Sequence, residues 1–599
     1  ELQQKVDGIY EKQGGRDTSQ KYQFGQDRTL ILLKPGTYDI EIKVSYYTSV
    51  AGLGKSPADV IVRNVTSWDA MDGHSTENFW RSVENLTIRP KTDAANIFSV
   101  SQAAPIRRII VDGNLNLSQH GWSSGGFMAD SIVSKQVTPI SQQQWITRNT
   151  KMGNWAGVNW NYVFVGCEGG PTVSSCGNNK STVVKDTTPV IAQKPTLFLE
   201  NDKYKILRPE QKQNAGAVSI EEFKKGEVID VDTTCYVTDP KTDTDTEINR
   251  ELSNGKHILL MPGVYELKDS IKVNKQNAMV IGFGMATLIS PQNGNPCIVV
   301  GDDVNNVVVS SMIFSAIGNT TKKITSLLQW GTKTPTADTT DKNIANGFAY
   351  DIFCRVGGNA DGDTECEAMV EINSNAIVGD NMWLWRADHG DNVGWTKNIA
   401  NNALVVNGHD VKMYGLAGEH TQKDIILWRG DRGKTYFYQS EMAYDGATGG
   451  SDYGNNVVSY RVTGKGHEAY GVGAYAFFGA GPTSTVPAHP KQIVKNAFVT
   501  PDDAKMIQPF TVSLFQGGFI NIWNGKGAGA SGEGKQWQYL CNANTDPGDP
   551  KKNDPNSADL QKNDHAARTV AIVIGGTILL SMIIVIVVLS MKRRNLKIN

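Results

Sequence analysis

The sequence predicts an all-β protein that contains two tandem parallel β-helices and ends in a single transmembrane helix. Three observations carry this prediction: an internal repeat of domain size, short apolar strands that recur about every 20 to 25 residues, and an uncharged run near the C-terminus. A chain of 599 residues is too long for one ordinary core. A β-helix avoids this limit because it lengthens by adding coils.

The repeat is visible in the segments that open each half. ILLKPGTY at residues 31–38 returns as ILLMPGVY at residues 258–265, an offset of 227 residues. Each copy is followed by an apolar strand and a Gly-x-Gly bend, which ends at Gly54 in the first half and at Gly284 in the second. Two matches at nearly equal offsets indicate a duplicated domain.

Within each half, apolar strands alternate with Gly, Asn and Asp, as in NNVVVSSMIF (305–314) and ALVVNGHDVKMYG (403–415). Helical periodicity is scarce between them. Two-residue hairpin signals are also scarce, which disfavours a sandwich or a meander. Stacked coils fit better, because each coil buries its inward side chains against its neighbours.

Composition changes along the chain set the predicted domain boundaries. A Thr-, Lys- and Asp-rich stretch separates the two halves, and a polar, Pro-containing stretch without aromatic residues follows the second half. The predicted parts are a first β-helix (1–180), a linker that crosses between the bodies (181–245), a second β-helix with C-terminal strands (246–541), a disordered stalk (542–568), a transmembrane helix (569–591) and a cytoplasmic tail (592–599).

The uncharged run at residues 569–591 is long enough to cross a bilayer, which takes about 20 apolar residues. Basic residues at 592–594 follow it, so the positive-inside rule places the tail in the cytoplasm and everything before the run outside. We therefore expect a single-pass plasma-membrane protein, exported with a signal peptide that is absent from this numbering. A cytosolic tail-anchored protein is the alternative.

Charge and cysteine content narrow the class further. Lys and Arg number 59 against 61 Asp and Glu, so we expect no nucleic-acid partner. Of seven cysteines, Cys167 with Cys176 and Cys354 with Cys366 are close enough in sequence to form disulfides, whereas the pairing of Cys235, Cys297 and Cys541 stays open. Five sequons predict glycosylation at Asn64, Asn85, Asn116, Asn179 and Asn319.

The paired openings KPGTYDIEIKVSYYTSVAGLG and MPGVYELKDSIKVNKQNAMVIGFG resemble the first coil of right-handed, pectin-lyase-like β-helices. The duplicated form resembles glycoside hydrolase family 55, β-1,3-glucanases built as two tandem right-handed β-helices. The segments from Gly125 to Cys167 and YGLAGEHTQKDIILWRGDRGKTYFYQSEMAYD in the second half extend the resemblance. It implies a glucan substrate and an inverting hydrolysis.

The resemblance also implies site residues. Glu441 in QSEMAY falls at the position of the general acid, and Glu419 in YGLAGEH lies about one coil earlier. Gln143 and Gln144 in SQQQWITRN fall where polar side chains hold the attacking water, with Ser141 or Gln142 nearby.

Spacing supports the carboxylate pair independently. Glu419 and Glu441 are 22 residues apart, close to one coil, so they should stack about 4.8 Å apart on neighbouring strands. Two carboxylates so close should raise the pKa of one of them, as a general acid requires. The alternative is a pair of solvated glutamates on an exposed face.

Aromatic side chains are candidates to stack on sugar rings. The predicted substrate-binding residues are Trp145, Trp160, Trp428, Tyr438, Tyr444 and His420, and Trp155, Trp383, Trp385 and Trp395 are further aromatic candidates. No metal or cofactor is expected, because NADGDTECE at residues 359–367 lacks the spacing of a calcium loop.

The predicted function is therefore that of a cell-surface glycoside hydrolase that acts on β-1,3-glucan, with Glu441 and Glu419 as its catalytic residues. One alternative keeps the fold without turnover, as a cell-surface glycan-binding or structural protein. Another is a polysaccharide lyase, which needs basic groups and often calcium near an acidic substrate.

Overall fold

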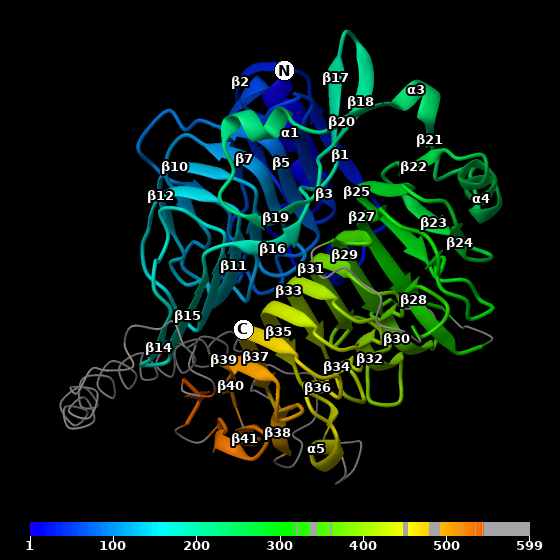
Figure 1. Cartoon of the computed structure of the whole chain (residues 1–599). Coiled ribbons are helices and arrows are strands. Elements are labelled where there is room, and N and C mark those ends of the chain that lie inside the picture. The colour runs from blue at the N-terminus through cyan, green and yellow to red at the C-terminus, as the bar shows by residue number, and fades with distance from the viewer. Residues whose placement is uncertain are drawn as a thin grey trace, which may run out of the picture. The chain divides into compact units, whose positions relative to one another are not determined.

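The computed structural model describes residues 1–318, 322–335, 344–359, 362–446, 453–478, 492–515, 517–532, 535–541 and 543. These residues contain two β-helices, the first coloured blue to cyan and the second green to orange in Figure 1. Residues 1–544 form one compact unit.

The first β-helix is a sheet of fifteen strands in which sequential coils pair in parallel, apart from the antiparallel hairpin β14·β15. Its main path is β1-β3-β5-β7-β9-β11-β13-β15-β14. The strands are β1 (Thr29–Leu33), β2 (Gly36–Lys43), β3 (Thr48–Gly52), β4 (Val60–Thr66), β5 (Arg81–Ile88), β6 (Asn96–Ile97), β7 (Ile106–Val111), β8 (Leu115–Asn116), β9 (Phe127–Ala129), β10 (Ile132–Thr138), β11 (Gln144–Arg148), β12 (Lys151–Trp155), β13 (Asn161–Val165), β14 (Ser175–Gly177) and β15 (Lys180–Lys185).

The second β-helix has one sheet of thirteen strands and one of ten. The larger sheet contains β21 (Cys235–Val237), β22 (His257–Leu260), β23 (Val264–Glu266), β25 (Met279–Ile289), β27 (Val307–Ala316), β29 (Gly347–Val356), β31 (Ile377–Arg386), β33 (Lys412–Glu419), β35 (Lys434–Glu441), β37 (Glu468–Ala476), β39 (Lys505–Ile507), β40 (Phe510–Ser513) and β43 (Trp537–Tyr539). The smaller sheet contains β24 (Ile271–Val273), β26 (Ile298–Val300), β28 (Ile324–Trp330), β30 (Glu365–Ile372), β32 (Ile399–Val406), β34 (Ile426–Trp428), β36 (Tyr460–Val462), β38 (Ile493–Val499), β41 (Gly518–Trp523) and β42 (Lys526–Ala528).

The predicted linker has structure of its own. Its elements are β16 (Thr188–Ile191), β17 (Thr196–Glu200), β18 (Lys203–Arg208), β19 (Lys212–Ala215), η2 (Ile220–Lys224), β20 (Glu227–Asp230) and α3 (Val231–Thr234). It contacts both bodies, since Phe223 accepts a hydrogen bond from Arg108 in the first β-helix and Ala192 accepts one from Tyr350 in the second.

The duplicated openings occupy equivalent places. ILLKPGTY forms β1 and the start of β2, and ILLMPGVY forms β22 and β23. β1 pairs with β3, and β22 and β23 pair with β25, the strands of the following Gly-x-Gly segments. A helix precedes each opening: α1 (Leu2–Lys12) in the first half and α4 (Asp245–Ser253) in the second. Three short helices complete the described elements: α2 (Gln20–Gln23), η1 (Pro57–Asp59) and α5 (Tyr453–Asn456).

A column of left-handed residues bends successive strands of the larger sheet at one level. Its members have φ between 50° and 74° and are Ser311, Asp351, Asn381, Gly415, Phe437 and Gly471. At two of these positions the first β-helix also comes close: a Cβ on Gly415 would lie 2.8 Å from the Phe127 ring, and one on Gly471 would lie 2.5 Å from Val163. Only glycine meets both demands there.

A shared interface joins the two β-helices. One apolar cluster draws on both bodies and the linker, including Phe127, Tyr350 and Tyr414. Beside it, Arg107 forms buried ion pairs with Asp351 and Asp380 at 2.9 and 2.7 Å. Paired, hydrogen-bonded charges are what a buried interface tolerates, so this network fixes how the two bodies fit.

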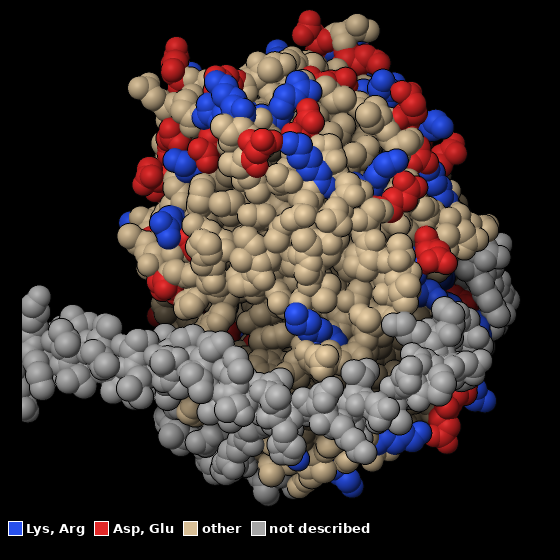
Figure 2. All heavy atoms as spheres, turned by 90° about the vertical axis from the view of Figure 1, so that its left-hand side faces the viewer, with Lys and Arg blue, Asp and Glu red and all other residues tan. Residues whose placement is uncertain are grey.

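Charges of both signs are mixed over the face of the first β-helix shown in Figure 2. Lysine and arginine side chains alternate with aspartate and glutamate along its upper part, and much of its middle carries no charge. This face therefore offers no extended patch of one sign.

The predicted disulfides are wrong. Cys176 bonds to Cys541, 365 residues away, which joins the β14·β15 hairpin to the segment after β43. Cys167 stays a thiol whose Sγ donates to Thr147 O at 3.3 Å, and burial raises its pKa to about 12. Sequence proximity misled the prediction because neighbouring residues in a coil point in different directions.

Cys354 and Cys366 are also free thiols in the interior of the second β-helix. They lie on β29 and β30, which belong to different sheets. Each thiol donates to a backbone carbonyl, Cys354 to Met369 at 3.9 Å and Cys366 to Ala368 at 3.0 Å. Cys235 and Cys297 are free and buried as well.

One predicted glycosylation site is wrong, because the Asn85 side chain is buried and donates to the Gly52 and Gly54 carbonyls. Asn64 and Asn116 are partly buried and Asn179 is exposed, whereas Asn319 lies outside the described residues. The predicted stalk, transmembrane helix and tail lie outside them too, apart from Ala543. In the part of the chain that is described, no helix is both long and apolar enough to cross a membrane.

Candidate functional site

Glu419 and Glu441 are the last residues of β33 and β35, and they are direct register partners in the parallel sheet. Neighbouring strands lie about 4.8 Å apart. The predicted stacking of the two glutamates is therefore confirmed. They end their strands at the edge of the larger sheet, close to the first β-helix.

Glu419 is almost fully buried and accepts three hydrogen bonds. Its Oε1 accepts from Gln102 Nε2 at 2.9 Å and from Gln439 Nε2 at 3.1 Å, and its Oε2 accepts from Trp383 Nε1 at 2.8 Å. Gln102 belongs to the first β-helix, and the other two donors belong to the second. The carboxylate of Glu419 therefore depends on the docking of both bodies.

Glu441 is less enclosed than Glu419: the Glu441 side chain is 15% exposed, whereas Glu419 is 3% exposed. The Tyr444 hydroxyl donates to Glu441 Oε2. His420 Nε2 lies 3.7 Å from the same oxygen, and the His420 ring packs edge-on against Tyr444. Glu441 is thus partly accessible to solvent and is held by one hydrogen bond, from Tyr444.

Burial and mutual repulsion govern the ionisation of this pair. Burial, and then the Glu441 carboxylate, raise the pKa of Glu419 well above its ordinary value. Burial also raises the pKa of Glu441, although His420 and the Tyr444 hydrogen bond oppose the rise. The two acids lie one coil apart, so each disfavours the ionisation of the other.

A second polar group extends from Glu441 toward the N-terminal segment. Asp388 Oδ1 lies 3.7 Å from His420 Nε2 and 2.9 Å from His389 Nδ1, and it accepts from Trp385 Nε1 at 3.1 Å. His389 Nε2 lies 2.5 Å from Gln23 Oε1 of α2. Despite its burial, Asp388 has a lowered pKa because of the charges of His389 and His420. Asp388 is thus the ionised neighbour of the glutamate pair.

The residues predicted to position water are divided by the structure. Gln144 is fully buried, and neither end of its amide has a hydrogen bond within the described residues. It lies near the site, since a Cβ on Gly125 would be 3.9 Å from Gln144 Cγ and 2.9 Å from Gln439 Oε1. Tyr475, the register partner of Glu441, likewise has a buried hydroxyl without a partner among the described residues.

The other predicted water-positioning residues have structural roles. Ser141 Oγ bonds to Ser118 Oγ at 2.6 Å and donates to Gly121 O at 2.5 Å. The Gln143 backbone carbonyl accepts from Trp160 N at 2.9 Å. Within the described residues, neither side chain forms a hydrogen bond to a glutamate of the pair.

A small cavity lies beside Glu419, with a volume of about 20 Å³. Its walls include all three residues that donate to Glu419, namely Gln102, Trp383 and Gln439. That volume is enough for about one water molecule, and the lining offers polar partners for it.

The predicted aromatic platforms are mostly core residues. Trp145, Trp428 and Tyr438 are fully buried inside their β-helices, so their assignment as substrate-binding residues is wrong. Trp160 is partly buried and packs against Tyr475 at 5.5 Å. Tyr444 and His420 remain candidates because they contact Glu441.

Several neighbours of the pair were missed from the sequence. Gln439 could have been predicted from the sequence, because it precedes Glu441 by two residues on the same strand and therefore shares its face. Gln102 and Asp388 had no local signal, since their contacts to the site cross between coils or bodies. Among the described residues, no group of three or more His, Cys, Asp or Glu side chains could hold a metal ion.

Comparisons with known proteins bear on this site. The LAM55 pectate lyase-like domain matches residues 236–441, which end at Glu441. An exo-beta-1,3-glucanase from Streptomyces sp. (strain SirexAA-E / ActE) is 38% identical over 494 residues, which cover 80% of this chain and 78% of that protein.

Solved structures show the same likeness. The structure of sacteLam55A from Streptomyces sp. SirexAA-E aligns with a TM-score of 0.82 at 34% identity, covering 90% of this chain and 96% of that one. A variant of sacteLam55A in complex with glucose aligns with a TM-score of 0.81 and the same identity and coverage.

Proposed function

We propose that this chain, which belongs to glycoside hydrolase family 55, hydrolyses β-1,3-glucan with Glu441 as its general acid. The observation that carries the proposal is the register pair Glu419 and Glu441, held at the junction of the two β-helices. The 38% identity to an exo-beta-1,3-glucanase supports the choice of substrate.

Hydrogen bonds and solvent access assign different roles to the two acids. Three N–H donors fix the orientation of the Glu419 carboxylate. Burial and the Glu441 charge still raise the pKa of Glu419 well above its ordinary value, so access, and not the pKa shifts, assigns the general acid to Glu441. Glu441 is the more accessible acid, and it would protonate the glycosidic oxygen as the bond to the anomeric carbon breaks. Glu419, with Gln102 and Gln439, would orient the attacking water.

The activity test uses the soluble ectodomain, residues 1–541, with laminarin and laminari-oligosaccharides. We expect wild type to release glucose or short oligosaccharides, and Glu441→Gln to release none while it still binds. Binding without release by wild type would favour an inactive glycan-binding protein. Unsaturated products that absorb in the ultraviolet would favour a polysaccharide lyase.

We further propose that hydrolysis inverts the anomeric centre, as the family resemblance implies. Inverting enzymes hold the attacking water between the base and the anomeric carbon, on the face of the sugar opposite the acid, whereas retaining enzymes use the second carboxylate as a nucleophile. Proton NMR of the first product distinguishes them: α-glucose should appear first from the β-linked chain. Early β-glucose would instead assign Glu419 as a nucleophile.

We also propose a cell-surface location, with residues 569–591 as the anchor. The support is the length of this uncharged run and the basic residues that follow it. Full-length protein should stay in the membrane fraction after carbonate washing, and a chain that ends at residue 541 should be released. Release of both chains would contradict the proposal.

A further inference from the structure

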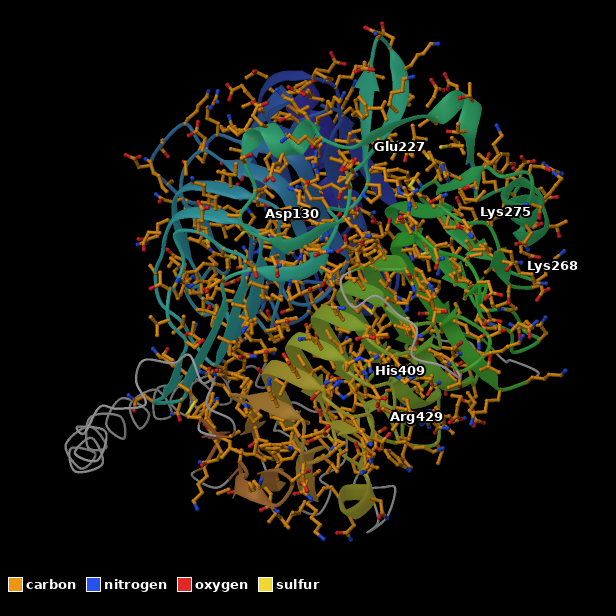
Figure 3. All side chains as sticks on the ribbon, viewed as in Figure 1. Asp130, Glu227, Lys268, Lys275, His409 and Arg429 are labelled. Atoms are coloured by element: carbon orange, nitrogen blue, oxygen red, sulfur yellow. A yellow bond between two sulfur atoms is a disulfide. The ribbon has the colours of Figure 1, made fainter. Side chains whose placement is uncertain are left out.

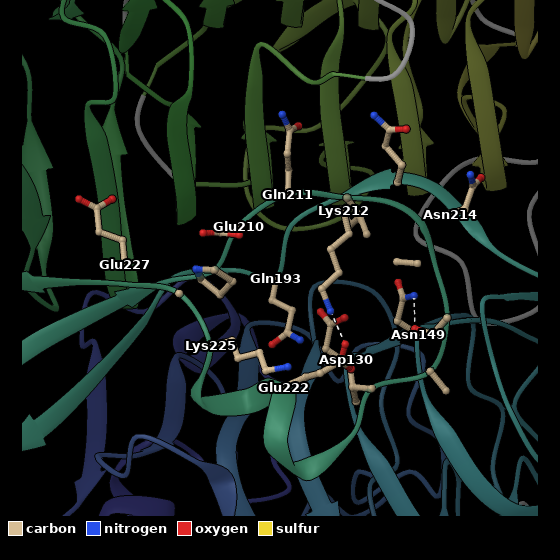
Figure 4. A pocket seen from close by; sticks show the side chains of 18 residues that line it. Asp130, Asn149, Gln193, Glu210, Gln211, Lys212, Asn214, Glu222, Lys225 and Glu227 are labelled. Atoms are coloured by element: carbon tan, nitrogen blue, oxygen red, sulfur yellow. Dashed lines mark hydrogen bonds and ion pairs between the residues drawn. The ribbon is translucent and has the colours of Figure 1, made fainter.

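We propose a second, non-catalytic glucan-binding groove, built around the linker at the edge of the interface far from the two glutamates. This inference rests on the proposed function for the identity of its ligand. Figure 4 shows the groove: the segment that carries Gln211, Lys212 and Asn214 passes over Gln193, Asp130 and Glu222.

The groove has the size of a ligand site. One cavity of about 670 Å³ lies under residues 209–218, and a second of about 560 Å³ lies on the side of the second β-helix. The two cavities share Gln193, Pro209, Glu210, Gln211 and Glu227. Ligand pockets commonly have volumes of about 300 to 1,000 Å³, and an oligosaccharide can use both sides of a shared wall.

The walls are held in place by hydrogen bonds to both bodies. Asn149 Nδ2 donates to Gly216 O at 2.6 Å, and Val218 N donates to Asn149 O at 3.2 Å. On the other side, Gln211 Oε1 accepts from Ala345 N of the second β-helix at 2.9 Å. The antiparallel pair β16·β19 supports the segment between these ties. A preformed groove loses little conformational entropy on binding.

The charges of the lining balance, so they favour neither an anionic nor a cationic ligand. Asp130 is neutralised by a two-pronged pair with Arg148, and Glu222 by Lys212. Outside these pairs, the two cavities are lined by Glu210 and Glu227 and by Lys225 and Arg208. Figure 3 shows Asp130 and Glu227 toward the junction of the β-helices, whereas Lys268 and Lys275 lie at the outer side of the second.

The polar side chains that line the groove can form hydrogen bonds with the hydroxyl groups of a sugar. Gln193 Oε1 accepts from Arg108 Nη1 at 2.5 Å, which leaves its Nε2 donor without a partner among the described residues. Gln211 is fixed in the same way through its Oε1. Amide donors next to the Glu210 and Glu227 acceptors match sugar hydroxyls, which donate and accept at once. A neutral, polyhydroxylated chain is therefore the ligand class, and for a glucan hydrolase that chain is a β-1,3-glucan.

The groove is separate from the catalytic pair. It borders Phe348 and Tyr350 near the start of β29, whereas Glu419 and Glu441 end their strands seven residues beyond Phe348 and five beyond Tyr350 along the aligned register. Five to seven residues of strand span about 17 to 23 Å. The groove would therefore hold a distant part of a long glucan, or another chain of the same polysaccharide, and short substrates would not reach it.

Gly216 is a position at which a bulky side chain can fill the groove. Gly216 lines the larger cavity, its φ is not left-handed, and a Cβ there would meet no atom within 4 Å. Gly216→Phe should therefore occupy the cavity without straining the backbone. Gly8→Phe on exposed α1 is the matched control, because a Cβ there also meets open space. Glu227→Ala is a second variant that removes an acceptor instead of adding bulk.

The test has three measurements. Affinity electrophoresis measures retention on laminarin, and calorimetry counts the laminarihexaose sites in the Glu441→Gln background. Kinetics give kcat/KM on laminaritriose. We expect two hexaose sites per chain, with one lost in Gly216→Phe, and a laminarin affinity at least threefold weaker in Gly216→Phe and Glu227→Ala. Hydrolysis of laminaritriose should match that of Gly8→Phe.

One hexaose site per chain, or laminarin retention unchanged by both groove variants, would overturn the inference. Thermal unfolding of each variant shows whether it is folded, and Glu227→Ala keeps the test decisive if Gly216→Phe is not. Failure of the proposed function would look different: wild type would hydrolyse neither laminarin nor laminaritriose, whatever the groove variants do.

Discussion

Glu419 and Glu441 occupy the same place on successive coils, yet their surroundings differ. Three N–H donors from two β-helices surround Glu419, whereas Glu441 has one hydroxyl donor, a nearby histidine and partial access to solvent. Equal positions in a repeating fold therefore do not give equal chemistry. The neighbours that the two bodies bring to each coil decide how firmly each carboxylate is held and how open it is to solvent.

The sharpest test of this comparison is Glu441→Gln. An amide cannot protonate the leaving oxygen, so kcat on laminarin should fall by at least about 10³-fold, with KM little changed, since general acid catalysis contributes about 10² to 10⁴. Aryl glucosides with acidic leaving groups need less protonation and should lose less. Equal losses on both substrates would contradict the assignment of Glu441 as the acid.

The next effect concerns Glu419. Glu419→Gln would place an amide nitrogen among three N–H donors, so we expect kcat to fall by about 10²-fold on laminarin and on activated aryl glucosides alike. This uniform loss is what separates a water-orienting role from a proton-donating one. Recovery of activity only with activated substrates would exchange the roles of the two glutamates.

A smaller effect tests the contribution of the first β-helix. Gln102→Ala removes one of the three donors to Glu419, and a hydrogen bond to a charged group is worth about 1.5 to 3 kcal/mol. We expect kcat/KM to fall about tenfold. Gln136→Ala on the outer strand β10 is the matched control. A loss as large in the control would show a general effect on folding, which thermal unfolding measures independently.

The smallest effect is a shift in the pH profile. The Tyr444 hydroxyl donates to Glu441 and so opposes the rise in the pKa of that acid. Without the donor in Tyr444→Phe, the pKa of Glu441 rises further, and activity persists to higher pH because the acid stays protonated. The alkaline limb of kcat against pH should move up by less than about one unit. A downward shift would contradict the sign.

Much of the architecture was predictable because a β-helix repeats. The duplicated ILLKPGTY and ILLMPGVY segments indicated two bodies, and the 22-residue spacing of the glutamates predicted their register. Both signals are local in sequence or periodic. The 22-residue spacing gave the right register because the coil from Lys412 to its register partner Lys434 is that long, whereas the coils on either side of it take 34 residues.

The rest of the site depends on contacts that sequence spacing does not encode. Gln102 lies 317 residues from Glu419, and the docking of two bodies brings them together. Trp428 and Tyr438 show the opposite difficulty, since an aromatic residue that fills a coil has the same composition signal as one that faces a sugar. The disulfide was mispredicted because its partners, Cys176 and Cys541, are 365 residues apart in sequence.

The Cys176–Cys541 bond closes a covalent ring that contains the linker and the second β-helix, whereas strands β1 to β13 of the first β-helix precede it. A single peptide cut anywhere between the two cysteines opens the ring without separating the pieces. After limited proteolysis in the linker, the halves should migrate together without reductant and apart with it. A cut before Cys176 has no such protection, so the ring divides the molecule into a segment that survives one cut and a segment that does not.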